Sequence, residues 1–210
     1  MKHKPFLFIF LLLLLLGLVA CMPTGVAEQT AENSSNSVTS DDEVNEGETA
    51  SVALDRCPGA PVGTTLFTNV EDGYCLLLPD GYAVDDSLTT DNGGAETAVY
   101  VDSMLDSSHA RLFITVEAAN GRTLEEVTTT KQEEFADFDV LYTFGYTLDG
   151  VPANQFDQLP GQDLSRVLLL VKDGRFYTLT FTPDDPAAEG AYADMQTLYD
   201  TVLTSFSFLR

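Results

Sequence analysis

The sequence predicts an α+β fold, in which a central antiparallel sheet carries helices on its faces. Three Asp-Gly pairs, at 72–73, 149–150 and 173–174, lie between apolar or β-branched runs. A two-residue hairpin turn needs positive φ at both central positions, so Asp-Gly between such runs is a strong hairpin signal. The run Val167–Val171 is apolar at every position, which indicates a strand covered on both faces. Two further segments carry helix start signals and apolar residues at helical spacing, and they predict the helices that cover the sheet.

The strands are placed by these turns and by one alternating run. Residues 111–117 alternate, with Leu112, Ile114 and Val116 on one face, as a half-buried strand does. Residues 99–104 are expected beside this strand, across a turn near 107–108. The three Asp-Gly hairpins are expected to join 66–70 to 74–78, 140–148 to 151–159, and 166–172 to 176–182.

Two helices are expected. The first begins at Thr123, which forms a capping box with Glu126. The second follows Asp185 and Pro186, an N-cap residue and a first-turn proline. We interpret the apolar stripes of both helices as core packing against the sheet, and residues 206–209 as a short terminal strand or an extended tail. The stripe residues are Leu124, Val127 and Phe135 in the first helix, and Tyr192, Met195, Leu198, Tyr199, Val202 and Phe206 in the second.

Four stretches of the globular part form a set of turn and core motifs. They are 73–82, 148–153, 172–181 and a last helix that ends in Ser-Phe-Ser-Phe at 205–208. Together they resemble the PsbP-like superfamily over most of residues 56–210. The resemblance implies a single globular domain, a central antiparallel sheet sandwiched between helices. Many bacterial relatives of this superfamily are lipoproteins without an assigned activity, and the shared positions imply a fold rather than a function.

Residues 1–20 have the form of a lipoprotein signal peptide. A short head with two lysines precedes the apolar run Phe6–Val19, which is short for a permanent membrane span. The sequence Leu-Val-Ala-Cys at 18–21 resembles the bacterial lipobox, which implies a lipid on the thiol of Cys21. Plain secretion would prefer a small residue at position 18, and an uncleaved anchor would be expected to carry a basic flank. We therefore expect an extracytoplasmic protein that is anchored to the cell membrane by a lipid at Cys21.

Residues 21–55 are predicted to be a disordered tether. They are mostly Ser, Thr, Asn, Gln, Glu and Asp, with isolated Val and Ala and no helical or strand period. So few large apolar side chains cannot offset the entropy cost of ordering the chain. A flexible segment of this length has a root-mean-square reach of about 30 Å, enough to lift a small domain clear of a bilayer.

The cysteine content predicts one disulfide. Once Cys21 carries a lipid, Cys57 and Cys75 remain as a pair outside the reducing cytoplasm. The alternative is two unpaired buried thiols. Two separated cysteines and His109 do not supply a closed ligand set, so we expect no metal site and no cofactor.

The charge excludes nucleic acid as a partner. The chain has 33 Asp and Glu against 10 Lys and Arg, a formal net charge of −23. Such a balance repels phosphate backbones, and its simplest interpretation is solubility on an exposed surface. Nucleophilic catalysis needs a base, and His109 is the only histidine after the signal peptide. We expect no enzyme activity, and a hydrolase that uses carboxylates alone is the least favoured alternative.

The predicted function is a non-catalytic interaction or accessory module with an unknown envelope protein as its partner. The alternative is a lipoprotein that binds a small ligand or Ca²⁺. The oxygen-rich stretch 85–96 is its candidate site, but this stretch lacks EF-hand spacing, and we interpret it as a solvated loop between strands. A pocket lined by Tyr100, Tyr142 or Tyr146 with converging carboxylates would favour this alternative.

Overall fold

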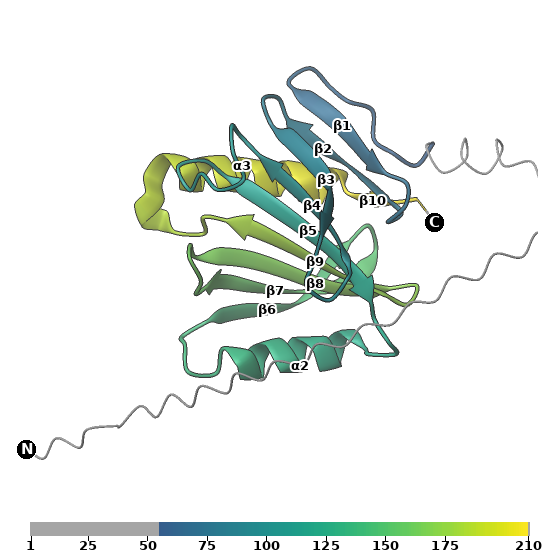
Figure 1. Ribbon diagram of the computed structural model, residues 1–210, viewed down its shortest axis with the longest axis vertical. Helices are drawn as coiled ribbons and strands as arrows, with labels where there is room; N and C mark the ends of the chain where they lie inside the picture. Colours follow the sequence, from purple (N-terminus) through teal and green to yellow (C-terminus); the bar gives the residue numbers. More distant parts are fainter. Residues whose placement is uncertain (1–54, 210) are drawn as a thin grey trace, which may run out of the picture. The chain divides into compact units, whose positions relative to one another are not determined.

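The computed structural model describes residues 55–209. The predicted signal peptide, the lipid site Cys21 and the tether apart from its last residue lie outside the described residues. Within residues 55–209 the chain forms two sheets and two α-helices (Figure 1). No helix in this part of the chain is both long and apolar enough to cross a bilayer.

The larger sheet has seven strands, and every neighbouring pair is antiparallel. The strand order is β3-β4-β5-β9-β8-β7-β6, so β3 and β6 form the two edges. This sheet confirms the predicted fold class. The bounds are Ala83–Thr89 for β3, Ala95–Tyr100 for β4, Arg111–Ala118 for β5, Leu141–Leu148 for β6, Val151–Leu159 for β7, Ser165–Lys172 for β8 and Arg175–Thr182 for β9.

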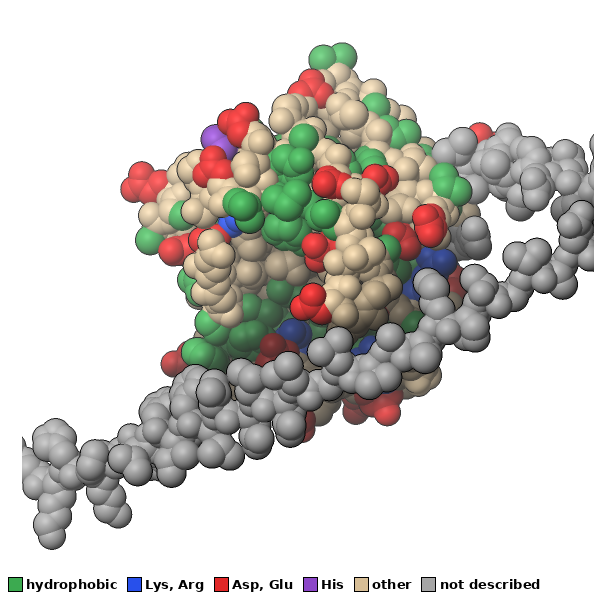
Figure 2. All heavy atoms as spheres, viewed as in Figure 1, with side chains coloured by type: hydrophobic (Ala, Val, Ile, Leu, Met, Phe, Trp, Pro, Cys, Tyr) green, Lys and Arg blue, Asp and Glu red, His purple; other side chains and the backbone are tan. Residues whose placement is uncertain are grey.

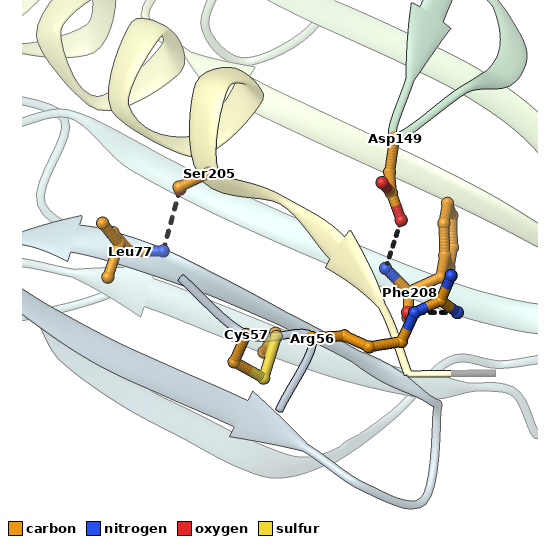
Figure 3. Close-up of a disulfide and its surroundings, with 7 residues drawn as sticks. Arg56, Cys57, Leu77, Asp149, Ser205 and Phe208 are labelled. Carbon is orange, nitrogen blue, oxygen red and sulfur yellow. Dashed lines mark hydrogen bonds between the residues drawn. A yellow bond between two sulfur atoms is a disulfide. The ribbon is translucent and has the colours of Figure 1, made fainter. Parts of the chain in front are cut away.

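The smaller sheet joins the two ends of the described chain. Its order is β1-β2-β10, with bounds Thr64–Asn69, Tyr74–Pro79 and Ser207–Phe208. The terminal strand expected at 206–209 is therefore present, and it pairs with the first residues of β2. The N–H of Leu77 in β2 also donates to the hydroxyl of Ser205 over 2.9 Å, which ties this sheet to the helix before β10 (Figure 3).

A disulfide joins Cys57 to Cys75, whose Cα atoms lie 5.8 Å apart. These are the two cysteines that the sequence leaves as a pair. Arg56 lies beside the disulfide, and its guanidinium donates to the carbonyl of Phe208 over 3.4 Å (Figure 3). The start of the described chain and its last strand are therefore both held on β2.

Two helices lie on opposite faces of the larger sheet. Helix α2 (Leu124–Glu134) packs on β7 and β8, and α3 (Glu189–Ser205) packs on β9 and on β2. In β8, Leu168 and Leu170 belong to the core cluster that contains the α3 stripe, whereas Leu169 belongs to the cluster to which α2 contributes. Alternate residues of β8 are thus buried under different helices, as the apolar run predicts.

The helix starts differ in how closely they follow the prediction. At α2, Thr123 accepts a hydrogen bond from the N–H of Glu126, and the Glu126 carboxylate accepts one from the N–H of Thr123, so the capping box is confirmed. The second start is corrected, because Asp185 caps a short 3₁₀ turn, η1 (Pro186–Ala188), and α3 begins only at Glu189.

Two of the three Asp-Gly turns have the predicted backbone. At 149–150 the φ angles are 47° and 76°, and at 173–174 they are 49° and 75°. The turn between β1 and β2 is longer than predicted. The carbonyl of Asn69 accepts from the N–H of Gly73, and only Gly73 has positive φ there. The Asn69 side chain accepts from the N–H of Asp72 over 2.9 Å, which stabilises the longer turn.

The stretch 85–96 is corrected from a loop to most of a hairpin. Residues 83–89 form edge strand β3, and only 90–94 connect it to β4. The strand predicted at 99–104 begins earlier, at Ala95, and ends at Tyr100. The sequence hides β3 because an exposed edge strand can be polar at successive positions, so it lacks the apolar alternation of a half-buried strand.

Candidate functional site

Four large apolar side chains are exposed on β6 and on the turn that leads into it. Phe138 and Phe144 are each 56% exposed, Tyr142 is 54% exposed and Leu141 is 62% exposed. We call these four residues the β6 apolar surface. In Figure 2 one group of hydrophobic side chains shows at the lower left, near β6 and the turn before it. Phe138, Tyr142 and Phe144 line cavities on the α2 side of the sheet, where exposed apolar side chains are typical of an interaction site, whereas Leu141 points to the other face of β6.

The backbone of β6 explains which way these side chains point. Tyr142 and Phe144 are two residues apart, so they share one face of the strand, and their ring centroids lie 5.2 Å apart. A bulge then interrupts the pairing with β7 between Thr143 and Tyr146, with Gly145 at φ 81°. After the bulge, Tyr146 packs against the main core cluster. The bulge therefore turns Tyr146 inward and leaves Tyr142 and Phe144 on the face that α2 covers.

A groove runs between α2 and β6. It consists of two adjacent cavities of about 270 and 510 Å³, and the side chain of Gln132 borders both. Phe135, Phe138, Tyr142 and Phe156 line the first cavity, and Leu124, Thr128, Phe144 and Asn154 line the second. We call this space the α2–β6 groove. Its walls combine aromatic rings with a few amide and hydroxyl groups, which is the usual lining of a binding cleft.

The surroundings of the groove are strongly acidic. From residue 124 to residue 144 the chain carries six carboxylates and one lysine, Lys131. Lys131 pairs with Glu134 over 2.8 Å and lies 5.3 Å above the ring of Phe135. In the part of the chain that the structure describes, Glu125, Asp137 and Asp139 form no salt bridge. A ligand in the groove would therefore meet negative potential at its rim.

The strands behind β6 are held by a buried ion network. Arg166 of β8 donates to Asp157 of β7 over 2.7 Å and to Asp184 over 3.1 Å, and its guanidinium lies 4.6 Å from the ring centre of Tyr199 in α3. The side chain of Asp184 is 1% exposed, and burial raises the pKa of this carboxyl, although Arg166 opposes the shift. Because Leu141 of β6 pairs with Asp157, the network supports the strand that carries the apolar surface.

A second and larger groove lies near the other edge of the sheet. Its volume is about 1140 Å³, and polar groups from the β1–β2 turn, the β3–β4 hairpin and the ends of β5 and β9 line it. The charged residues of its lining are Glu71, Asp72, Asp86, Glu117, Arg122 and Arg175. Four carboxylates against two guanidinium groups leave the lining with a net negative charge, and Arg175 already pairs with Asp72 over 3.6 Å.

The expectation that residues 85–96 could hold Ca²⁺ gains no support. Among residues 55–209 no group of three or more His, Cys, Asp or Glu side chains comes together as a metal site. Asp72, the buried carboxylate of this groove, already accepts from the side chain of Asn69 over 3.0 Å. Burial raises the pKa of Asp72, although the nearby Arg175 opposes the shift.

The other residues singled out in the sequence do not converge. Tyr142 lines the α2–β6 groove, whereas Tyr146 packs into the core and Tyr100 lies at the end of β4. His109 lies in the connection between β4 and β5 and is partly exposed. These positions give no support to a tyrosine-lined pocket with converging carboxylates.

Sequence reasoning missed the α2–β6 groove. Residues 140–148 were predicted as an ordinary hairpin strand, and the apolar stripe of the first helix as core. The available signal lies in residues 137–144. Carboxylates at 137 and 139 alternate there with Phe138 and Val140, and Leu141 and Tyr142 then follow without a polar residue between them. A half-buried strand alternates apolar with polar residues, so this stretch has more apolar side chains than one buried face of a strand can hold.

Comparisons with known proteins add a likeness of fold. No family model matches the sequence, and no curated protein matches it at a significant level. Among solved structures, the solution structure of cyanobacterial PsbP (CyanoP) from Synechocystis sp. PCC 6803 is similar, with 17% sequence identity and a TM-score of 0.45. The match covers 72% of this chain and 96% of that chain.

Proposed function

We propose that this chain is an extracytoplasmic accessory protein that is tethered to the membrane through Cys21 and binds a partner protein through the α2–β6 groove. The observation that carries the proposal is the β6 apolar surface beside this groove. Exposing four large apolar side chains on one strand and its turn favours aggregation, unless another surface covers them. The groove offers a lining for binding, and we assign no catalytic role to it.

The predicted tether fits this role. A protein held at the membrane by a lipid and about thirty flexible residues samples a volume close to the bilayer, which raises its effective concentration toward partners in the same membrane. A modest affinity at the groove then suffices for binding.

The anchor is tested by labelling. Cells that express the full chain are grown with radiolabelled palmitate, and the Cys21→Ser variant is the control. We expect label in the unaltered chain and none in the variant. Label in neither chain would contradict the anchor.

The surface is tested by site-specific crosslinking in the native cells. A photoreactive benzoylphenylalanine replaces Phe144 in one full-length chain and Asp91, on the β3–β4 turn, in a second. We expect a discrete crosslinked protein from position 144 that is absent from position 91 and is lost when Tyr142→Thr is added. Equal products from both positions, or none from position 144, would contradict partner binding at β6.

A further inference from the structure

We infer that the partner docks as an extended segment that adds a strand to the free edge of β6, and that this segment carries Lys or Arg beside apolar side chains. This inference rests on the proposed function and names the chemistry of the partner. It is carried by three features of the described chain: an unpaired strand edge, a groove beside this edge, and an acidic rim.

The outer edge of β6 has no partner within residues 55–209. In the larger sheet β6 is the last strand and pairs with β7 alone. None of the backbone hydrogen bonds outside regular elements involves residues 141–147. The outward N–H and C=O groups of an edge strand form a ready template for a further strand.

The side chains of β6 do not protect this edge. Proteins commonly block edge strands with charged residues or proline, and β6 reads Leu-Tyr-Thr-Phe-Gly-Tyr-Thr-Leu without either. The bulge at Gly145 bends the strand, but the residues before the register shift, Leu141–Thr143, keep regular pairing with β7 and are exposed. Pairing along this stretch offers a partner several backbone hydrogen bonds.

The α2–β6 groove lies where side chains of an added strand would point. Successive side chains of a strand alternate between faces, so every second residue of the partner would face the α2 side of the sheet. There it meets Tyr142 and Phe144, with Leu124 and Phe138 as the walls of the groove. Apolar side chains at alternate positions would fill the groove, as in other cases where a peptide adds a strand beside a helix.

The carboxylates at the rim of the α2–β6 groove indicate which charge the partner segment carries. Glu125 lines the groove, and Asp137 and Asp139 lie in the turn that leads into β6, all without a salt bridge among the described residues. A segment with Lys or Arg at the ends of its apolar stretch, where the rim carboxylates lie, satisfies these carboxylates. A second copy of this chain brings the same carboxylates to the interface, and an anionic bilayer is repelled by them, so both are disfavoured.

The inference is tested with blocked octapeptides against the full chain in phosphatidylcholine nanodiscs. The first peptide has Val or Phe at alternate central positions, with Thr between them and Lys at both ends, and the second has Glu in place of every Lys. Two further peptides repeat the Lys sequence with N-methyl groups on the amides of either the odd or the even positions. Because neighbouring amides of a strand point to opposite edges, strand addition requires that one methylated peptide loses binding while the other keeps it.

We expect the Lys peptide to bind and one methylated form to bind about tenfold more weakly or worse, since several backbone hydrogen bonds are lost together. The Glu peptide should not bind. Asp137→Asn with Asp139→Asn should weaken binding about tenfold, whereas the matched pair Asp85→Asn with Asp86→Asn on β3 should leave it unchanged.

Several outcomes would overturn the inference. They are absence of binding by the Lys peptide, equal binding by both methylated peptides, binding of the Glu peptide, or equal sensitivity to the β3 pair. If the chain forms a dimer that Tyr142→Thr abolishes, the surface binds a second copy. If the Cys21→Ser chain binds vesicles and Tyr142→Thr abolishes this binding, the surface binds the bilayer. If crosslinking from position 144 persists while the peptides fail, strand addition is wrong and the proposed function stands.

Discussion

The two edges of the seven-stranded sheet are built in opposite ways. Edge strand β3 carries Asp85, Asp86 and Ser87 in succession, with a register shift in the same place. Edge strand β6 carries no charge and exposes Leu141, Tyr142 and Phe144. Both edge strands have a register shift in their pairing, so the charges distinguish them. Charged side chains keep an edge from joining another strand, which protects β3 against unwanted pairing and leaves β6 open.

The net charge of the chain does not predict how either edge of the sheet is built. Carboxylates lie on the β3 strand itself, where they block the approach of another strand, whereas near β6 they lie on α2 and in the preceding turn. The same residue type therefore protects one edge and, in the complex that we propose, selects for a cationic partner at the other. The difference is one of placement relative to the backbone hydrogen-bonding groups.

The largest expected effect tests what holds the β6 end of the sheet. Arg166→Met leaves Asp157 and the buried Asp184 without their counter-charge, and this should lower the free energy of unfolding by about 3–5 kcal/mol. The measurement is chemical denaturation of the full chain at neutral pH. Lys131→Met, which breaks the exposed pair with Glu134, is the matched control and should cost less than about 1 kcal/mol. Similar losses in both variants would show that the network gives no special support behind β6.

The next effect tests the packing beside β3. A Cβ atom at Gly94 would lie 2.6 Å from Cγ of Glu117 and 2.9 Å from the carbonyl oxygen of Val116. Gly94→Ala should therefore destabilise the chain by about 1–3 kcal/mol, because backbone must move to admit the methyl group. Gly190→Ala in α3, with no atom within 4 Å of its Cβ position, should be neutral or stabilising. An unchanged denaturation midpoint for Gly94→Ala would mean that the β3–β4 hairpin is not held tightly against β5.

The third effect is a pH dependence with opposite signs at two carboxylates near β3. Burial raises the pKa of Asp72 in the folded state, so the folded protein keeps this proton to a higher pH than the unfolded protein does. The free energy of unfolding therefore falls as the pH rises above 3.8, the ordinary pKa of Asp. Hydrogen bonds from Ser87 lower the pKa of Asp85, so its contribution is present above 3.8 and is lost as pH falls through the folded-state pKa.

Denaturation between pH 3 and 7 separates the two carboxylates. Relative to the unaltered chain, Asp72→Asn should gain stability as the pH rises through the range just above about 3.8, whereas Asp85→Asn should lose relative stability as the pH rises through the range just below it. The same sign for both variants would contradict the buried state of Asp72 or the hydrogen bonds of Asp85.

The smallest expected effect on stability is at the exposed rings of β6, and it is the most direct test of the difference between the two edges. Tyr142→Thr and Phe144→Thr remove exposed rings from β6 and introduce a residue that strands accept, so each should change the free energy of unfolding by only about 0.5 kcal/mol or less. Tyr142→Thr should also abolish the crosslink from benzoylphenylalanine at position 144. A loss of several kcal/mol would instead show that these rings belong to the core, and the binding surface would have to be abandoned.

Much of the fold was predictable because local chemistry decides it. The Asp-Gly pairs at 149–150 and 173–174 need nothing beyond their own positive φ angles, and the capping box at Thr123 needs only Glu126. The apolar stripe of α3 and the two-sided burial of residues 167–171 follow from periodicity. These features depend on neighbours in sequence, which a single sequence displays.

The missed features depend on neighbours in space. The turn at 70–73 lengthens because the Asn69 side chain bonds to Asp72, and β3 forms because β4 pairs with it despite its polar sequence. The groove exists only because α2 lies beside β6, two elements that sequence reasoning treated separately. Exposure of Phe144 is a property of sheet order, and no residue in β6 reveals that the strand is last in its sheet.

The disulfide has a mechanical consequence. Tension applied to the chain ahead of Cys57 passes through the sulfur bridge directly into Cys75 on β2, so the intervening stretch 58–74, including β1, bears no load. Strand β2 is the middle strand of its sheet and also bonds to α3 through Leu77 and Ser205. A pull from that side is therefore received by the middle strand of the small sheet, while β1 stays paired with β2 and carries none of the load.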